Sequence, residues 1–303
     1  MSDACVLALP GSEDCADRIA ACLGDARVAV ESRRFPDGER YLRVAGEVAG
    51  RDAIVVARLR EPDPQLPALL FLADALRDLG AASVGLVAPY LPYMRQDARF
   101  RPGEAVTSHS VAKWIGGTFD WLATVDPHLH RIARLDALYR LPCAVVPSAP
   151  AIALWLQHHV ARPHVVGPDA ESVQWAREVA ALVPCGASVL RKTRTGDRAV
   201  RIELPDLAPL AGRTPVLVDD IVSSAHTLAE AVRALRAAGL AAPVCVAVHA
   251  VFAGGARELL ADAGAAQVAS CNTLVHPSNA IDVLPALAEA ARALRAEARR
   301  PRR

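Results

Sequence analysis

Residues 216–248 read VLVDDIVSSAHTLAEAVRALRAAGLAAPVCVAV, and the fold class follows from this pattern. The apolar run at 216–218 is typical of a strand, and 227–238 places apolar residues three and four apart, as one buried helix face requires. Gly239 follows this helix, where glycine commonly adopts the left-handed conformation that ends it. A second apolar strand is expected at 244–248. Strands that are apolar on both faces belong to sheets covered by helices on both sides, so the stretch predicts a β-α-β unit in a mostly parallel sheet.

The first half of the chain repeats this pattern. Residues 54–56 form an expected strand, 66–79 an amphipathic helix ending before Gly80, and 84–87 a further strand. We interpret the match as an internal duplication, although generic α/β patterning also produces such matches. The sequence therefore predicts an α/β protein of two tandem domains, with the boundary near Leu141–Pro142.

The bulk composition excludes several classes of protein. The chain has 303 residues, of which 34 are basic and 33 acidic, so no broad basic field for nucleic acid is expected. Its seven scattered cysteines have no Cys-x-x-Cys spacing, which argues against a zinc site or a disulfide framework and fits a reducing cytosol. No apolar run reaches the roughly 20 residues that span a bilayer, and no signal peptide is evident. We expect a cytoplasmic protein without membrane or nucleic-acid partners.

The residues between the second-half strand and its helix suit a ribose phosphate. The N-terminus of a helix offers unpaired N–H groups and the positive end of a dipole, which bind phosphate. Ser223, Ser224 and Thr227 add hydroxyl donors. Asp219 and Asp220 can accept hydrogen bonds from two neighbouring hydroxyls, such as the 2- and 3-hydroxyls of ribose. The alternative is a helix cap after a buried strand, with Asp220 merely solvated.

These residues resemble a known loop. Residues 216–228 are similar to the phosphoribosyl diphosphate loop shared by phosphoribosyltransferases and ribose-phosphate pyrophosphokinases. The resemblance implies that ribose 5-phosphate binds through Asp219, Asp220, Ser223, Ser224, Ala225, His226 and Thr227. Two residues depart from the usual pattern, Ser223 where many members have Asp and His226 where Gly is usual. Glycine there suits a backbone that curls around phosphate with φ > 0, and histidine tolerates that region better than most residues.

Two segments in the first half resemble only the pyrophosphokinases. Residues 35–39, Phe-Pro-Asp-Gly-Glu, are similar to that family's adenine-binding segment, which reaches into a neighbouring subunit. Residues 93–104 follow a strand and contain three arginines, which can clamp a polyphosphate. The resemblance implies that ATP binds through Phe35, Asp37, Glu39, Arg95, Gln96 and Arg99. The alternatives are an ordinary surface hairpin for 35–39 and a basic surface loop for 93–104.

Metal-binding residues are expected in two further segments. In the family, a histidine at the His128 position of residues 126–130 helps to hold the Mg²⁺ of Mg-ATP, and His130 is an alternative ligand. Because magnesium prefers oxygen ligands, a structural or helix-capping histidine is the other interpretation. Asp169 follows an apolar strand, and the resemblance implies a metal- and ribose-binding aspartate there. It also suits the N-cap of a helix beginning near Ala170.

Residues 191–194, Arg-Lys-Thr-Arg, match the mobile catalytic loop of the family, which implies catalytic roles for Lys192 and Arg194. The 1-hydroxyl of ribose attacks the β-phosphorus of ATP, and AMP leaves. A lysine and an arginine on a closing loop neutralise the charge that grows on the transferred diphosphate, and they exclude water. The alternative is an exposed basic hairpin. No Gly-x-x-x-x-Gly-Lys-Ser/Thr motif is present, so ATP binding needs a scaffold other than the P-loop.

The resemblance covers almost the whole chain, from about residue 35 to 279, with its motifs in the family's order. It implies two tandem phosphoribosyltransferase-like domains at 1–142 and 143–288, each a mostly parallel sheet flanked by helices, and a C-terminal helix and tail at 289–303. It implies a homo-oligomeric ribose-phosphate diphosphokinase of nucleotide biosynthesis, which uses Mg²⁺ and makes 5-phosphoribosyl 1-diphosphate and AMP from ATP and ribose 5-phosphate. Residues 99–104 look more like the archaeal-type branch than like the bacterial and animal enzymes regulated by ADP. A phosphoribosyltransferase and a non-catalytic regulatory relative of the synthase are the alternatives.

Overall fold

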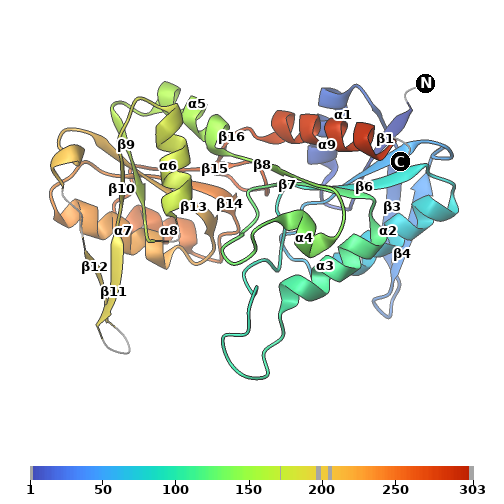
Figure 1. Ribbon diagram of the computed structural model, residues 1–303, viewed down its shortest axis with the longest axis horizontal. Helices are drawn as coiled ribbons and strands as arrows, with labels where there is room; N and C mark the ends of the chain where they lie inside the picture. The colour runs from blue at the N-terminus through green and yellow to red at the C-terminus, as the bar shows by residue number, and fades with distance from the viewer. Residues whose placement is uncertain (1–2, 171, 196–198, 204–206, 300–303) are drawn as a thin grey trace. The chain divides into compact units, whose positions relative to one another are not determined.

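The computed structural model describes residues 3–170, 172–195, 199–203 and 207–299, with the backbone alone described at 191–195 and 199–203. The chain divides into two compact units (Figure 1). The first comprises the described residues up to Val146 and those from Leu284 onward, and the second spans Pro147–Val283. In the described part of the chain, every helix is too short or too polar to cross a membrane.

The first unit is built on a parallel six-stranded sheet. Its strands lie in the order β2-β1-β5-β6-β7-β8, and every neighbouring pair is parallel. The strands are β1 (Ala4–Ala8), β2 (Ala26–Arg27), β5 (Asp52–Val56), β6 (Ser83–Ala88), β7 (Trp121–Val125) and β8 (Cys143–Val146). β1, β5 and β7 are buried at every residue, as expected for strands with helices on both faces of their sheet.

Helices pack on both faces of this sheet (Figure 1). α1 and α9 contact each other and the strands on one face, and α2 packs with α3 on the other. The helices are α1 (Glu13–Leu23), α2 (Leu66–Asp78), α3 (Thr107–Thr118), α4 (Leu135–Tyr139) and α9 (Leu284–Ala298). In α2, the fully buried Leu69, Leu72 and Leu76 recur every three or four residues, which gives the single apolar face that the sequence indicated.

The C-terminal helix α9 belongs to the first unit, although the second unit precedes it in the chain. Its buried Leu287 and Leu294 lie on the face that packs against α1 and β7. Arg295 adds an ion pair, since its Nη1 lies 2.6 Å from the buried carboxylate of Asp25. An apolar face and a paired charge together hold the helix to the first sheet.

The observed limits of the units differ from the boundaries expected at residues 142 and 288. The first unit continues to Val146 because β8 pairs in parallel with β7 and completes the sheet. The last helix begins at Leu284 and returns to the first unit, so the second unit ends at Val283.

The second unit repeats this architecture. Its sheet has the order β10-β9-β13-β14-β15-β16, again with every neighbouring pair parallel. The strands are β9 (Pro163–Gly167), β10 (Ala187–Val189), β13 (Thr214–Val222), β14 (Val244–Ala250), β15 (Gln267–Cys271) and β16 (Asn279–Ile281). Helices α5 (Ala149–His159) and α6 (Val173–Leu182) pack together on one face, and α7 (His226–Ala237) and α8 (Ala256–Asp262) on the other.

The two units share one topology, which supports the internal duplication inferred from the sequence. In each, the first two strands are followed by an antiparallel hairpin before the third strand of the sheet. The hairpin is β3 (Ala29–Arg34) with β4 (Arg40–Ala45) in the first unit, and β11 (Arg191–Thr195) with β12 (Ala199–Glu203) in the second. The predicted α/β fold of two mostly parallel sheets flanked by helices is confirmed.

The cysteines are free thiols. Burial raises the pKa of Cys143 and of Cys245 to about 12. Both therefore stay protonated at neutral pH, where only a thiolate would act as a nucleophile or metal ligand.

Candidate functional site

Strand β13 carries the two aspartates and leads into residues 219–227, here called the phosphoribose loop. β13 extends to Val222, so Asp219 and Asp220 lie within the strand, not beyond its end as the sequence suggested. Asp220 is 6% exposed, and its Oδ1 accepts the N–H of Ile221 at 2.7 Å. The Oδ1 of Asp219 accepts the N–H of Asp220 at 3.2 Å. The alternative interpretation of Asp220 as a merely solvated side chain is therefore wrong, because its carboxylate is buried and accepts a backbone hydrogen bond.

The phosphoribose loop passes directly into helix α7. Ala225 is the N-cap of α7 and is left-handed, with φ 60° and ψ 8°, and His226 is the first helical residue. The expectation that the His226 position needs φ > 0 is wrong, because the chain makes its left-handed turn one residue earlier. Ser224 and His226 are exposed, so the start of α7 is open to a ligand.

A second loop supports the phosphoribose loop from the side. The N–H of Phe252 donates to the carbonyl of Val222 at 2.9 Å, and the N–H of Ala253 donates to the carbonyl of Ser223 at 2.9 Å. Phe252 has φ 25°, and its ring lies 4.5 Å from that of His276. This support could not be predicted from the sequence, because backbone N–H groups make the contact and any residue type except proline supplies them.

Asp169 lies at the same edge of the second sheet as the phosphoribose loop. It follows β9, which pairs in parallel with β13, so both strands end at this edge. The strand order reverses between β9 and β13, and open α/β sheets bind ligands at such a switch point. The Oδ1 of Asp169 accepts the N–H of Ser172 at 3.2 Å. The helix begins only at Val173, with Ser172 as its N-cap, so the helix start expected near Ala170 is wrong.

The expected adenine segment is the turn of the β3–β4 hairpin. The N–H of Phe35 donates to the carbonyl of Glu39 at 2.8 Å, and the N–H of Glu39 donates to Oδ1 of Asp37 at 3.1 Å. The Arg33 guanidinium lies over two rings, 4.6 Å from the centre of Phe35 and 4.5 Å from that of Tyr41. The turn is thus an ordered aromatic platform with two acids.

A cavity of about 530 Å³ adjoins this hairpin on the side of α2. It is lined by Arg34, Gly38, Glu39, Arg40, Pro64, Pro67 and Phe71. Cavities of this size accept small ligands. Of the expected adenine-binding residues, Glu39 faces it.

Residues 95–104, here called the basic loop, follow β6. Arg95 and Arg99 are exposed, and Gln96 is half-buried. Arg99 Nε donates to the carbonyl of Glu104 at 3.0 Å, and Oε2 of Glu104 accepts the N–H of Phe100 at 2.8 Å. The loop is therefore folded on itself around Glu104.

The two histidines follow β7 and lie close together. Their ring centres are 3.9 Å apart at 78°. Because β6 and β7 are parallel neighbours, the loop with His128 and His130 leaves the sheet at the same edge as the basic loop with Arg95 and Gln96. The structure groups these residues at one edge, whereas residues 35–39 belong to a separate hairpin.

The expected catalytic residues lie on the β11–β12 hairpin. Lys192 is opposite Ile202, and Arg194 is opposite Val200. The backbone therefore forms a hairpin, as the alternative interpretation expected, and the catalytic roles of Lys192 and Arg194 stay a prediction. The side chains of Lys192 and Arg194 fall outside the described part of the structure.

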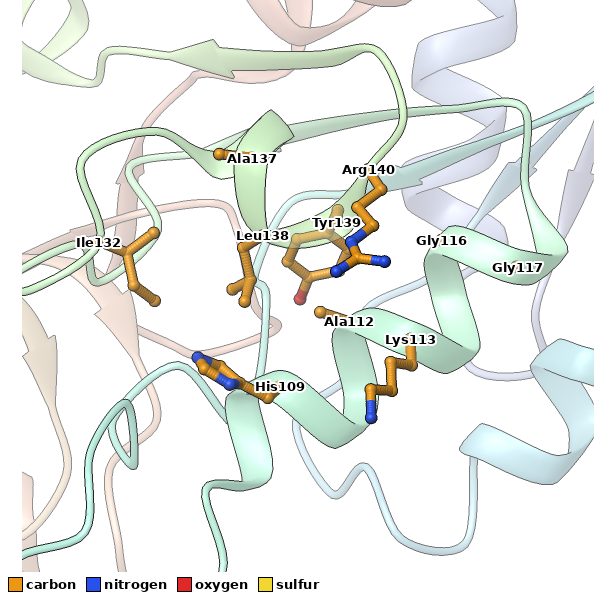
Figure 2. A pocket seen from close by; sticks show the side chains of 10 residues that line it. All are labelled: His109, Ala112, Lys113, Gly116, Gly117, Ile132, Ala137, Leu138, Tyr139 and Arg140. Atoms are coloured by element: carbon orange, nitrogen blue, oxygen red, sulfur yellow. The ribbon is translucent and has the colours of Figure 1, made fainter.

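A further cavity of about 540 Å³ lies between α3 and α4 (Figure 2). Its apolar wall includes Ile132 and Leu138, and Lys113 and Arg140 project beside it. The residues that line this cavity are all different from the expected substrate-binding ones.

Comparisons with known proteins match both units. The family described as the N-terminal domain of ribose phosphate pyrophosphokinase matches residues 4–117, and the phosphoribosyl transferase domain matches residues 149–285. The ribose-phosphate pyrophosphokinase of Methanobrevibacter smithii is 31% identical over 294 residues, covering 93% of this chain and 97% of that protein. That of Methanopyrus kandleri is 35% identical over 269 residues, covering 88% and 91%.

This chain belongs to the ribose-phosphate pyrophosphokinase family.

The likeness to this family extends to the structure. The crystal structure of phosphoribosylpyrophosphate synthetase from Mycobacterium smegmatis superposes with a TM-score of 0.85 at 27% identity, covering 97% of this chain and 99% of that one. The ribose-phosphate pyrophosphokinase resemblance inferred from the motifs is confirmed. The match to residues 4–117 contains both the adenine segment and the basic loop, which lie outside the phosphoribosyl transferase domain.

Proposed function

We propose that this chain is an ATP-dependent ribose-phosphate diphosphokinase. It transfers the diphosphate of ATP to the 1-hydroxyl of ribose 5-phosphate and yields 5-phosphoribosyl 1-diphosphate and AMP. The observation that carries the proposal is β13, whose two aspartates are followed by a left-handed turn at Ala225 and the open start of α7. The names of the relatives, ribose-phosphate pyrophosphokinases, support the same reaction.

Ribose 5-phosphate fits the phosphoribose loop by charge and hydrogen bonding. Its 5-phosphate accepts hydrogen bonds from the first N–H groups of α7 and from the hydroxyls of Ser223, Ser224 and Thr227. The carboxylates of Asp219 and Asp220 accept hydrogen bonds from the ribose 2- and 3-hydroxyls. Phe252 and Ala253 hold the loop backbone in place through the two hydrogen bonds described above.

ATP is assigned to the first unit. The adenine meets the platform of Phe35 with Asp37 and Glu39, and Arg95, Gln96 and Arg99 of the basic loop bind the phosphates. The family resemblance implies that the adenine segment serves a neighbouring subunit, so the active form is a homo-oligomer.

The acids of the second unit fit a magnesium ion. Mg²⁺ takes oxygen ligands and keeps several waters, and Asp169 brings a carboxylate to the same sheet edge as Asp219 and Asp220. His128 offers a nitrogen ligand, which suits Mg²⁺ less well. When bound with ATP, the ion neutralises charge on the phosphate oxygens.

The β11–β12 hairpin stabilises the transfer. The ribose 1-oxygen forms a bond to the β-phosphorus and loses its proton to solvent, the bond from that phosphorus to the bridging α-phosphate oxygen breaks, and the electron pair leaves with AMP. Lys192 and Arg194 neutralise the charge that accumulates on the diphosphate and the leaving oxygen. Such transfers need positioned charges rather than a covalent intermediate.

The two alternative functions are not favoured. A phosphoribosyltransferase leaves the family match to residues 4–117 without a role. A non-catalytic regulatory relative has no need of the basic pair Lys192 and Arg194 or of the acids Asp219 and Asp220, which are all present.

Product analysis tests the proposal. The purified protein is incubated with Mg-ATP and ribose 5-phosphate, and the products are followed by ³¹P NMR. AMP and 5-phosphoribosyl 1-diphosphate should appear in equal amounts, and Lys192→Ala should suppress both. Release of ADP, or no turnover by the wild type, contradicts the proposal.

A further inference from the structure

Arg131 links the loop that carries His128 and His130 to the basic loop of the first unit. It directly follows His130 in the loop that leaves β7. Its guanidinium reaches the basic loop at two points. Nη1 lies 2.9 Å from Oδ1 of Asp97, and the guanidinium carbon lies 5.1 Å from the centre of the Phe100 ring. One side chain therefore joins two loops that carry expected ATP- and metal-binding residues.

The contact with Asp97 is a buried one. The Asp97 side chain is 1% exposed, whereas that of Arg131 is 52% exposed. The other carboxylate oxygen of Asp97, Oδ2, is buried without a hydrogen-bond partner among the described residues. A buried carboxylate needs a compensating charge, and Arg131 supplies it. Asp97 immediately follows Gln96, so this ion pair fixes the backbone beside two expected ATP-binding residues.

The contact with Phe100 fixes the same loop from its other side. Phe100 is exposed, and a guanidinium over an aromatic face is attracted to it. The N–H of Phe100 is bonded to Glu104, so the ring and the fold of the loop are linked. Arg99 lies in the sequence between Asp97 and Phe100, the two residues that Arg131 contacts. The backbone of Arg99 is therefore held on both sides.

We propose that Arg131 is a positioning residue for ATP, which holds the basic loop in its binding shape against the loop of His128. This inference rests on the proposed function, because it concerns the nucleotide of that same site. It predicts that loss of Arg131 frees the basic loop and weakens ATP binding, while ribose 5-phosphate binding stays unchanged. The competing explanation is that the half-exposed guanidinium itself contacts a phosphate of ATP.

The order of the basic loop can be measured without any turnover. Trypsin cleaves the bond after Arg99 only when the loop opens, and mass spectrometry identifies the fragments. Arg131→Gln should speed this cleavage about tenfold, since a hydrogen bond to a charged group is lost. The matched control is Arg134→Gln, because Arg134 lies in the same loop, is 76% exposed and pairs with Asp136. It should cleave at the wild-type rate.

Kinetics separate a positioning role from a general loss of structure. In Arg131→Gln, the KM for ATP should rise about tenfold and the KM for ribose 5-phosphate should stay within about twofold. Arg131→Lys should recover part of the ATP affinity, because it keeps a charge for Asp97. An equal rise in both KM values, with a lowered Tm, would show a merely structural role.

A double-mutant cycle separates positioning from direct contact. If Arg131 acts through Asp97, then Asp97→Asn should raise the KM for ATP like Arg131→Gln, and the two changes together should raise it no further. If Arg131 contacts ATP itself, the effects multiply, which would overturn the positioning role.

In Arg131→Gln the buried Asp97 carboxylate loses its partner, and this variant then fails as a test if it does not fold. Phe100→Leu is the second variant, because it removes the other contact of Arg131 and leaves the ion pair intact. Phe100 is exposed, so its replacement does not disturb the core, and a smaller rise in the KM for ATP is expected. If both Arg131→Gln and Phe100→Leu keep the wild-type rate of trypsin cleavage and the wild-type KM for ATP, the inference is overturned. A wild type without synthase activity refutes the proposed function instead, while the trypsin result still stands.

Discussion

Replacing either aspartate of β13 by asparagine tests the proposed ribose site with little disturbance to the fold. The Oδ1 of each already accepts a backbone N–H, from Ile221 for Asp220 and from Asp220 for Asp219. An asparagine amide oxygen accepts the same bond, so the strand keeps its local structure. The substitution removes the negative charge that is proposed to attract a ribose hydroxyl.

The expected effect follows from the chemistry of the lost bond. A hydrogen bond to a charged acceptor contributes about 1.5–3 kcal/mol, and one to a neutral acceptor about 0.5–1.5 kcal/mol. The difference of roughly 1–1.5 kcal/mol corresponds to a rise of about tenfold in the KM for ribose 5-phosphate. The KM for ATP should change little, because the expected ATP-binding residues lie in the first unit.

Comparison of ribose 5-phosphate with 2-deoxyribose 5-phosphate identifies the hydroxyl that each acid binds. The wild type should prefer the ribose form, because the deoxy sugar leaves one carboxylate without its hydroxyl. In the variant that lacks the partner of the 2-hydroxyl, this preference in kcat/KM should shrink about tenfold. The other variant should keep it. Asp262→Asn is the matched control, since Asp262 is an exposed acid on α8 of the same unit.

The result that refutes this reasoning is clear. If Asp219→Asn and Asp220→Asn both retain the wild-type preference for the ribose form, neither acid binds the 2-hydroxyl. If both also keep the wild-type KM for ribose 5-phosphate, the two acids have no part in sugar binding.

Three further outcomes are expected. Lys192→Ala should lower kcat about 10²–10³-fold with substrate affinities nearly unchanged, and a kcat within about threefold of wild type in steady-state kinetics contradicts its catalytic role. A mixture of Phe35→Ala and Lys192→Ala chains should recover activity after reassembly, since mixed sites contain both intact halves; no recovery, or an active monomer, excludes a shared site. Ala225→Gly should raise the free energy of unfolding by up to about 1 kcal/mol, because glycine tolerates φ 60°. His226→Gly should lower it by a few tenths to about 1 kcal/mol, because His226 is helical. Denaturant titration that gives the reverse order refutes the assigned backbone.

Local patterns predicted the elements of this fold closely. The helix expected at 66–79 is α2 at Leu66–Asp78, and the one expected at 227–238 is α7 at His226–Ala237. Gly80 and Gly239 follow these helices with φ 81° and 78°, as the left-handed ends required. Such features depend on neighbours a few residues apart, which is why one sequence suffices to predict them.

Contacts between segments far apart in the sequence could not be predicted from these patterns. The Arg131–Asp97 pair joins residues 34 positions apart, and nothing in either segment marks the other. The return of α9 to the first unit depends on which sheet its apolar face fits, although the helix itself is predictable. The left-handed turn fell at Ala225 instead of His226 because the chain path, not residue preference, fixes where α7 begins.

The two units share one topology but differ at the residues that are proposed to bind ligands. Where the second unit has Asp219 and Asp220, the first has Ala57 and Arg58 after the equivalent strand. There the Arg58 side chain is buried and its Nη1 lies 2.6 Å from Asp14 at the start of α1. α1 is the counterpart of α6, so in the first unit an internal ion pair lies beside the switch point between β1 and β5.

The two equivalent hairpins also carry different functional side chains. In the first unit the hairpin bears the aromatic turn of Phe35, and in the second it bears Lys192 and Arg194. The first unit has no paired aspartates at its switch point, so we expect its ligand contacts to come from the hairpin and from the loops after β6 and β7. The expected ATP-binding residues and the positioning residue Arg131 lie on those elements. The switch point of the second unit keeps its acids and its open helix start, so it is the one suited to a ribose phosphate.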